Sequence, residues 1–132
     1  MLEKYPRQVK LVFKNLPLRS HKFARQAAAA ALAAHAQGRF WDFHDALFVS
    51  YSKLNEAMVE EIRALLDLDK NTFDARRKAP QVRDQIQKDM QWAREAGVKG
   101  TPTVFINGRL QRQRSLESFS SAVEVELRRL GK

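Results

Sequence analysis

The stretch Gly-Thr-Pro-Thr-Val-Phe-Ile-Asn-Gly at residues 100–108 carries the most information about the fold. Its β-branched and aromatic run at 103–106 predicts a strand. Pro102 stands where that strand begins, so its missing N–H does not interrupt a hydrogen-bond ladder. Asn107 and the glycine after it predict a two-residue hairpin turn, which makes residues 109–112 the return strand. The stretch therefore predicts a β-hairpin that follows a proline turn.

Another strand is predicted near the start of the chain, over residues 9–13. Apolar and polar residues alternate there before the sequence becomes continuously apolar, and Pro17 ends the run. Between this strand and the hairpin, apolar side chains recur every three or four residues, which is typical of helices buried on one face. Capping residues divide that stretch into five helices. Their expected limits are Ser20 to Gly38, 40–48, a helix capped by Asn55, a short helix capped by Asp69 or Asn71, and Pro80 to Gly97.

The order of these elements limits the fold class. Ser115 can cap a final helix after the hairpin, so the chain runs strand, five helices, hairpin, helix. This order is typical of an α/β protein, α+β by content, with a large helical insertion. The length of 132 residues suits one domain, and 44% hydrophobic with 30% charged residues indicates a globular chain.

One helix is unusually aromatic. Residues 40–48 read Phe-Trp-Asp-Phe-His-Asp-Ala-Leu-Phe, which is apolar on more than one side. Such a cluster could form a stacking platform for a ligand. Because its spacing is helical and mostly apolar, we expect instead that Phe40, Trp41, Phe43 and Phe48 pack in the core.

Two stretches together resemble one known family. Residues 12–21, the alanine-rich helix after them and residues 37–48 are similar to the bacterial DsbA-like thioredoxin-fold thiol–disulfide oxidoreductases, as is the proline–hairpin stretch. The resemblance runs from about Tyr5 to Leu130. It implies one DsbA-like domain, 1–132, in which 1–18 and 98–132 form the remaining thioredoxin-fold part and 19–97 form an inserted helical part.

The resemblance also indicates which part of the family's site is missing from this chain. The family's redox centre is a Cys-x-x-Cys at the start of a helix, upstream of the strand that corresponds to residues 9–13. This chain has no cysteine, and residues 2–6 resemble the end of that helix. The resemblance therefore implies an N-terminally truncated, incomplete thioredoxin fold without catalytic residues. Lacking a thiolate, such a chain has no nucleophile for dithiol chemistry.

In the family, the strand before the redox helix lies between the strands that correspond to 9–13 and 103–106. Without it, both neighbours have unpaired N–H and C=O groups, which are costly if buried. The two strands could pair with each other in antiparallel fashion, or a second chain could cover the gap as a homodimer or domain swap. We expect the dimer, because the lost helix would also leave apolar surface uncovered.

Thr101 and Pro102 are the candidate substrate-binding residues. The resemblance implies that Pro102 is a cis proline and that Thr101, before it, binds extended peptide or protein substrate through its backbone, as an added strand. The alternative is that the two residues only shape the turn into the strand. The family often has Gly-Ala after the hairpin. Residues 112–114, Arg-Gln-Arg, replace it here, so we expect a shorter or more exposed return strand.

Three functions remain open at this point. The first is a thiol–disulfide oxidoreductase relative that is inactive in dithiol chemistry as it stands. The second is a relative of the kappa-class glutathione transferases and isomerases, whose reactive serine would also lie upstream. The third is a non-catalytic binding or assembly protein that uses a basic surface. The sequence of residues 100–108 favours the oxidoreductase relative.

Other kinds of site find little support. No histidine spacing fits a zinc site, so we expect no metal and no cofactor. The net charge of +9 favours anionic partners in general, yet no nucleic-acid-binding motif accompanies the arginines, and we expect no nucleic acid. No apolar run approaches the roughly 20 residues of a membrane helix. Without a signal peptide the chain as written is expected in the cytoplasm, or in the periplasm if an upstream segment carries one.

Overall fold

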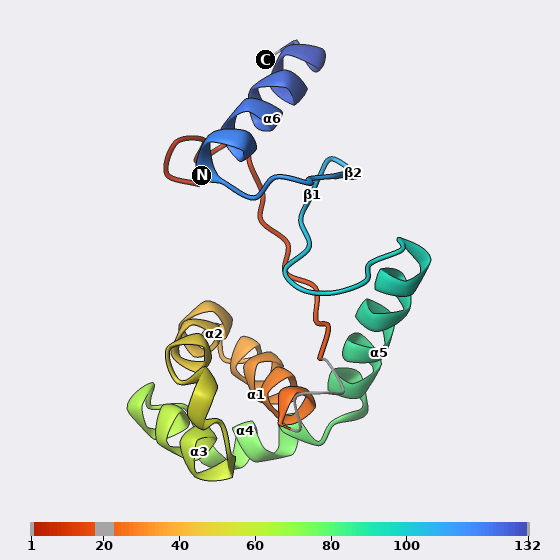
Figure 1. Cartoon of the computed structure of the whole chain (residues 1–132). Helices are drawn as coiled ribbons and strands as arrows, with labels where there is room; N and C mark the ends of the chain where they lie inside the picture. Colours follow the sequence, from red (N-terminus) through yellow and green to blue (C-terminus); the bar gives the residue numbers. More distant parts are fainter. Residues whose placement is uncertain (1, 18–22, 132) are drawn as a thin grey trace. The chain divides into compact units, whose positions relative to one another are not determined.

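The structure, a computed structural model, describes residues 2–17 and 23–131 (Figure 1). The chain divides into two compact units. We call Asn15–Ala96 the helical unit, and Met1–Lys14 with Gly97–Lys132 the hairpin unit. The predicted cap Ser20 lies outside the described residues.

The described residues of the helical unit form five α-helices and one 3-10 turn. The side chain of Asn55 accepts a hydrogen bond from the backbone N–H of Met58 at 2.8 Å, and Asp69 accepts one from Thr72 at 2.9 Å. Asp69, not Asn71, is therefore the cap of the short helix. Pro80 occupies the first turn of the last helix, where no N–H is needed. The elements are α1 (Ala24–His35), α2 (Phe40–Val49), η1 (Tyr51–Lys53), α3 (Glu56–Leu65), α4 (Lys70–Arg77) and α5 (Pro80–Glu95).

The core of the helical unit is built around α1, which packs against α2, α4 and α5. Ala30, Ala33 and Ala34 of α1 are fully buried, and their small side chains let the neighbouring helices approach closely. Phe43 of α2 and Phe73 of α4 are fully buried as well, with stacked rings whose centroids lie 5.5 Å apart. Aromatic side chains thus fill the space that the alanines leave.

A buried polar cluster holds the start of the helical unit against α5. The carboxylate of Asp89 accepts hydrogen bonds from the backbone N–H of Asn15 at 2.9 Å and from the amide of its side chain at 2.7 Å. Gln85 donates to the other carboxylate oxygen at 2.9 Å. Asp89 and Asn15 are both buried, so these bonds replace the water that each group loses.

The described residues of the hairpin unit form two short strands and one helix. Strands β1 (Phe105–Ile106) and β2 (Arg109–Leu110) are antiparallel, and Phe105 pairs with Leu110. Asn107 and the glycine after it have positive φ angles of 48° and 81°, as the predicted hairpin turn requires. Helix α6 (Leu116–Arg129) begins at Ser115, whose side chain forms a capping box with Ser118. The return strand ends at Leu110, two residues before the predicted end at residue 112.

The strand predicted over residues 9–13 does not form. Within the described residues the sheet consists of β1 and β2 alone. The segment has no regular secondary structure, and the side chains of Leu11 and Val12 are 56% and 58% exposed. A strand is stable only beside a partner that takes its N–H and C=O groups, and alternation in the sequence cannot supply that partner.

The prediction for the aromatic helix is wrong in part. Phe43 is fully buried in the core, but Phe48 and Trp41 of the same helix are 63% and 43% exposed. A ten-residue helix at the rim of a small core has one face toward it, so apolar side chains on the other face remain in solvent.

Candidate functional site

The predicted site residues lie on the loop that leads into β1. Thr101 and Pro102 are exposed and Thr103 is half-buried, and the peptide bond between Thr101 and Pro102 is cis. The hydroxyl of Thr103 donates to the carbonyl oxygen of Gly100 at 2.6 Å, which closes the turn. Nη1 of Arg114, on the segment after β2, donates to the carbonyl oxygen of Pro102 at 2.8 Å. The loop is therefore held from within and from the far side of the hairpin.

The backbone of Thr101 has unused hydrogen-bonding capacity. Among the described residues, neither its N–H nor its C=O has a hydrogen-bond partner. Pro102 has no N–H, and its carbonyl oxygen is already bonded to Arg114. Thr101 thus offers one donor and one acceptor at an exposed position, which is the pair an added antiparallel strand uses.

The hairpin behind this loop is attached to α6 through Glu126. This largely buried carboxylate lies 3.3 Å from Nε of Arg109 on β2 and 3.3 Å from Nη1 of Arg129 on its own helix. The side-chain amide of Asn107 at the hairpin turn donates to it at 3.5 Å. The backbone N–H of Gln111 also donates to the carbonyl of Val104 at 2.9 Å, which extends the pairing beyond the strands.

The N-terminal segment is attached to the outer side of α6 by Glu124. The phenol of Tyr5 donates to this carboxylate at 2.7 Å and the ammonium of Lys4 at 3.3 Å. The hydrogen bond from Tyr5, followed by that from Lys4, lowers the pKa of Glu124, and the same bond raises the pKa of Tyr5. Tyr5 is buried, so residues 4–5 are the anchor of this segment in the hairpin unit.

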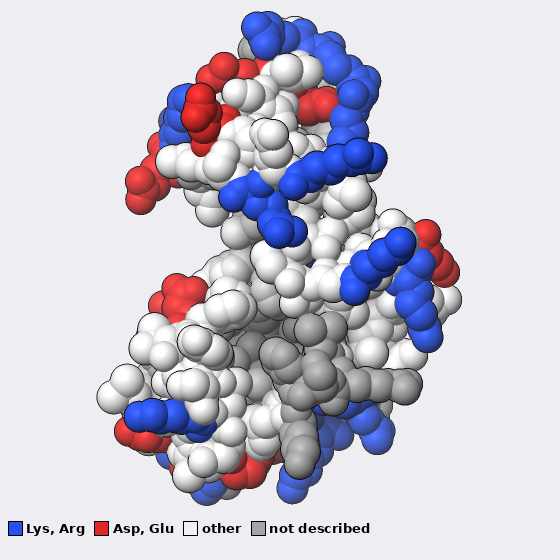
Figure 2. Space-filling model, in the orientation of Figure 1, with Lys and Arg blue, Asp and Glu red and all other residues white. Residues whose placement is uncertain are grey.

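Positive charge is concentrated in the hairpin unit. Its sequence holds eleven Lys and Arg against four Glu, a net charge of +7, whereas the helical unit holds thirteen basic and eleven acidic residues, a net charge of +2. Figure 2 shows lysine and arginine side chains gathered over the unit that contains α6. Between Gly97 and Ser115 there are four basic residues and no acidic one.

The histidines do not form a metal site within the described residues, where no three His, Cys, Asp or Glu side chains converge. His44 lies among the aromatic rings of α2, with its ring centroid 4.6 Å from that of Phe48, and His35 lies at the end of α1. His21 lies outside the described residues. No helix in the described ranges is both long and apolar enough to cross a bilayer.

Sequence reasoning identified Thr101 and Pro102 as neighbours, but it did not anticipate the contact from Arg114. The signal was present in the Arg-Gln-Arg at 112–114, where the family often has Gly-Ala. The contact depends on the path of the segment after β2, which brings Arg114 back to the carbonyl of Pro102.

The chain matches known proteins over most of its length. Residues 1–125 match the family described as Thioredoxin. A thioredoxin-like oxidoreductase from Silicibacter pomeroyi DSS-3 has a similar crystal structure, with a TM-score of 0.74 and 28% sequence identity over 90% of this chain and 68% of that one.

Two kinds of curated protein are similar in sequence. The Na(+)/H(+) antiporter NhaA 3 of Salinispora tropica is 37% identical over 117 residues, which are 87% of this chain and 18% of the antiporter. The probable disulfide bond formation protein D of Bacillus anthracis is 28% identical over 130 residues, 92% of this chain and 59% of that protein. The chain thus spans less than a fifth of the antiporter and about three fifths of the disulfide bond formation protein.

Proposed function

The chain belongs to the thioredoxin family, on its DsbA-like side, and from this premise we propose that it binds extended polypeptide at Thr101 and Pro102 without performing dithiol–disulfide exchange. Its relatives include a thioredoxin-like oxidoreductase and a probable disulfide bond formation protein, which supports descent from thiol–disulfide oxidoreductases. The chain itself has no cysteine. Exchange begins with a thiolate attacking a disulfide sulfur, so this chain alone has no atom that can form the mixed disulfide.

The observation that carries the proposal is the free backbone of Thr101. An exposed residue whose N–H and C=O both lack partners can pair with one residue of an extended peptide, which then runs along the loop as an added strand. The hydrogen bonds from Arg114 to the carbonyl of Pro102 and from Thr103 to the carbonyl of Gly100 hold the residues on both sides of Thr101. Little ordering of the loop is then needed on binding, which favours affinity.

Backbone methylation of the peptide tests this mode directly. A fluorescent ten-residue peptide with free backbone amides should bind the full chain in an anisotropy titration. A strand pairs through alternate residues, so N-methylation at the paired residue should abolish binding, whereas methylation one residue further should leave it. Equal binding of both methylated peptides would mean that strand addition is not the mode, and no binding of any peptide would refute the proposal.

Absence of dithiol chemistry is tested separately. The purified chain should not accelerate the reduction of insulin by dithiothreitol, because no thiolate is available to relay electrons. A cysteine-containing thioredoxin would serve as the positive control. Turnover by the cysteine-free chain would overturn the chemical half of the proposal and leave peptide binding to be judged on its own.

The two other hypotheses are weaker. A relationship to kappa-class glutathione transferases has no particular support, whereas the disulfide bond formation relatives support the oxidoreductase side. A general assembly role through the basic surface is compatible with the +7 charge of the hairpin unit but does not use the free backbone of Thr101. Peptide binding uses the free backbone of Thr101 directly.

We also propose that a second copy of the chain covers residues 9–13 in a homodimer. The supporting observation is that Leu11 and Val12, in a segment with the composition of a strand, are more than half exposed. A segment of this composition can become a strand when it pairs with another chain. Light scattering after size exclusion should give twice the mass of 15.2 kDa at micromolar concentration, and Val12→Lys should give the monomer. A monomeric wild-type chain would refute this part.

A further inference from the structure

Three basic side chains around the proposed peptide site lack an acidic partner. Within the described residues, Lys99, Arg112 and Arg114 form no ion pair. Some other basic side chains are paired, such as Arg63 with Glu60 at 2.7 Å and Arg109 with Glu126 at 3.3 Å, although several on the helices also form no ion pair within the described residues. The loop therefore carries positive charge that no ion pair among the described residues neutralises.

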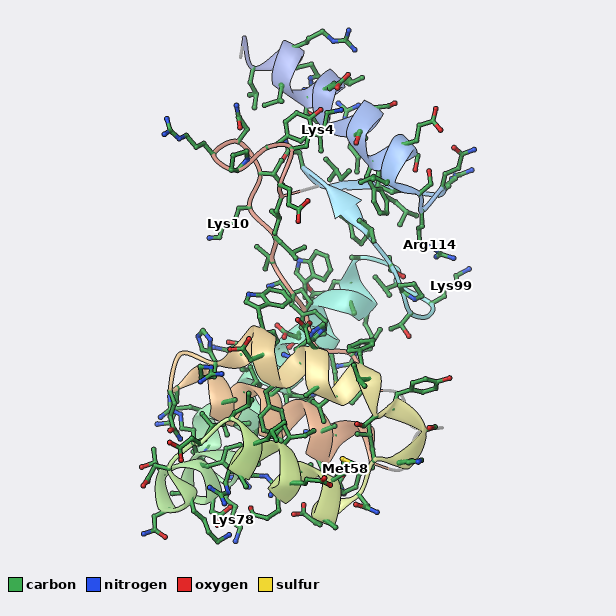
Figure 3. All side chains as sticks on the ribbon, turned by 90° about the vertical axis from the view of Figure 1, so that its left-hand side faces the viewer. Lys4, Lys10, Met58, Lys78, Lys99 and Arg114 are labelled. Carbon is green, nitrogen blue, oxygen red and sulfur yellow. The ribbon has the colours of Figure 1, made fainter. Side chains whose placement is uncertain are left out.

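Two of these cations border Thr101. Arg114 bonds to the carbonyl of the adjacent Pro102, and Lys99 precedes Thr101 by two residues, which is at most about 7 Å of backbone. Figure 3 shows both side chains projecting from the same side of the loop. A peptide strand paired with Thr101 would pass beside both.

We infer that this loop selects extended peptides that carry an aspartate or glutamate side chain, and that Arg114 is the residue that recognises it. The inference rests on the proposed peptide binding and adds its specificity. Side chains of a strand alternate between its two faces, so an acidic residue at the paired position or two residues away lies on the side of Arg114. One N–H of Arg114 is used by Pro102, and the planar guanidinium has further donors for a carboxylate.

The bond to Pro102 makes Arg114 the stronger candidate of the two cations. A guanidinium held at one end loses less conformational freedom on binding than a free lysine side chain. Lys99 has no hydrogen bond among the described residues and supplies charge without a defined position. Arg114 therefore sets where the carboxylate lies, and Lys99 adds attraction.

The test compares three peptides of one sequence with Glu, Gln or Lys at a single central position. Both ends are blocked by acetylation and amidation, so no terminal carboxylate can act. The Glu peptide should bind about fivefold more tightly than the Gln peptide at low salt, as expected for an exposed ion pair. The preference should disappear at about 0.5 M NaCl, where the screening length is only a few ångströms.

Two variants with equal loss of charge assign the effect. Arg114→Gln keeps an amide donor for the Pro102 carbonyl and should reduce the Glu-to-Gln affinity ratio to about one. Arg128→Gln, at the exposed end of α6, should keep the ratio. Arg114→Glu should reverse the preference toward the Lys peptide, which separates recognition from damage to the fold.

The outcomes are distinct for the two proposals. If the wild-type chain binds the Glu and Gln peptides equally, the selectivity is refuted while peptide binding stands. If Arg128→Gln abolishes the preference for the Glu peptide as fully as Arg114→Gln, the preference comes from the overall positive charge of the unit, and the role of Arg114 is refuted. If no peptide binds, both proposals fall. If a single-stranded oligothymidine binds more tightly than the Glu peptide and loses its affinity in Arg114→Gln, nucleic acid replaces peptide as the ligand.

Discussion

The helical unit and the hairpin unit differ in how much core each possesses. Fourteen of the sixteen buried apolar side chains among the described residues belong to the helical unit, and only Tyr5 and Val123 belong to the hairpin unit. The net charges run the other way, +2 against +7. One unit is stabilised mainly by apolar burial, and the other mainly by hairpin pairing, helix capping and ion pairs.

This difference bears on function. A peptide-binding loop needs backbone groups and charges that have no partner within the protein. Such groups would lower stability if they were buried in a core, so they are better placed on an exposed loop. The hairpin unit has these features, whereas in the helical unit the buried Asp89 accepts hydrogen bonds from Asn15 and Gln85. We therefore expect substitutions in the helical unit to act on stability and those around Thr101 to act on binding.

The largest effect should come from the aromatic pair in the core of the helical unit. Phe43→Ala removes a fully buried ring stacked on Phe73 and should lower the free energy of unfolding by about 3–5 kcal/mol. Phe48→Ala, on the same helix but 63% exposed, is the matched control and should cost less than about 1 kcal/mol. Urea titration followed by circular dichroism measures both. Similar losses of unfolding free energy for the two variants would contradict the difference between a buried and an exposed face of α2.

The next effect should come from the buried carboxylate. Asp89→Ala leaves the backbone N–H and side-chain amide of Asn15 buried without an acceptor, which should cost about 2–3 kcal/mol. Asp84→Ala changes an exposed carboxylate on the same helix and should be nearly neutral. The same urea titration compares them. A neutral Asp89→Ala would indicate that water replaces the carboxylate and that the cluster is not needed for packing.

Features set by neighbouring residues could be predicted from the sequence. The caps at Asn55, Asp69 and Ser115 and the turn at Asn107 depend on hydrogen bonds within three residues, so residue type and spacing suffice. The helical insertion and the final helix followed from apolar periodicity joined to these caps. The fold class, α+β with a helical insertion, is confirmed on this basis.

Features that need a distant partner could not be predicted. Residues 9–13 have the composition of a strand, but a strand also needs a neighbour, and the sheet of the described residues contains β1 and β2 alone. The contact between Arg114 and Pro102 spans twelve residues and depends on how the hairpin returns. Exposure of Phe48 depends on which face of α2 meets α1, which a helix apolar on several sides does not reveal. The role of Thr101 and Pro102 stays a prediction.

A smaller, local effect should follow in the hairpin unit. Glu126→Gln removes the charge shared with Arg109 and Arg129 and should weaken the hairpin by about 1 kcal/mol. The readout is hydrogen exchange at the amide of Gln111, which bonds to Val104, and it should accelerate about fivefold. Exchange in α1 should not change. Glu117→Gln, at an exposed position of α6, is the control, and acceleration in α1 as well would mean that the two units do not open separately.

The smallest effect concerns acid and the attachment of the N-terminal segment. The pKa of Glu124 is lowered in the folded chain by Tyr5 and then Lys4, so its contribution to stability is present above the unfolded value of about 4.3 and is lost as pH falls through the lower folded value. The amide of Val9, which donates to the carbonyl of Tyr5, should therefore exchange faster in acid while amides of α1 stay protected.

Tyr5→Phe removes the main hydrogen bond, so the carboxyl resonance of Glu124 should titrate at higher pH than in the wild type. Tyr51→Phe, an exposed tyrosine in the helical unit, should leave that titration unchanged. If Glu124 titrates identically in the wild type and Tyr5→Phe, the phenol does not hold the segment, and apolar burial of the Tyr5 ring becomes the cause of attachment.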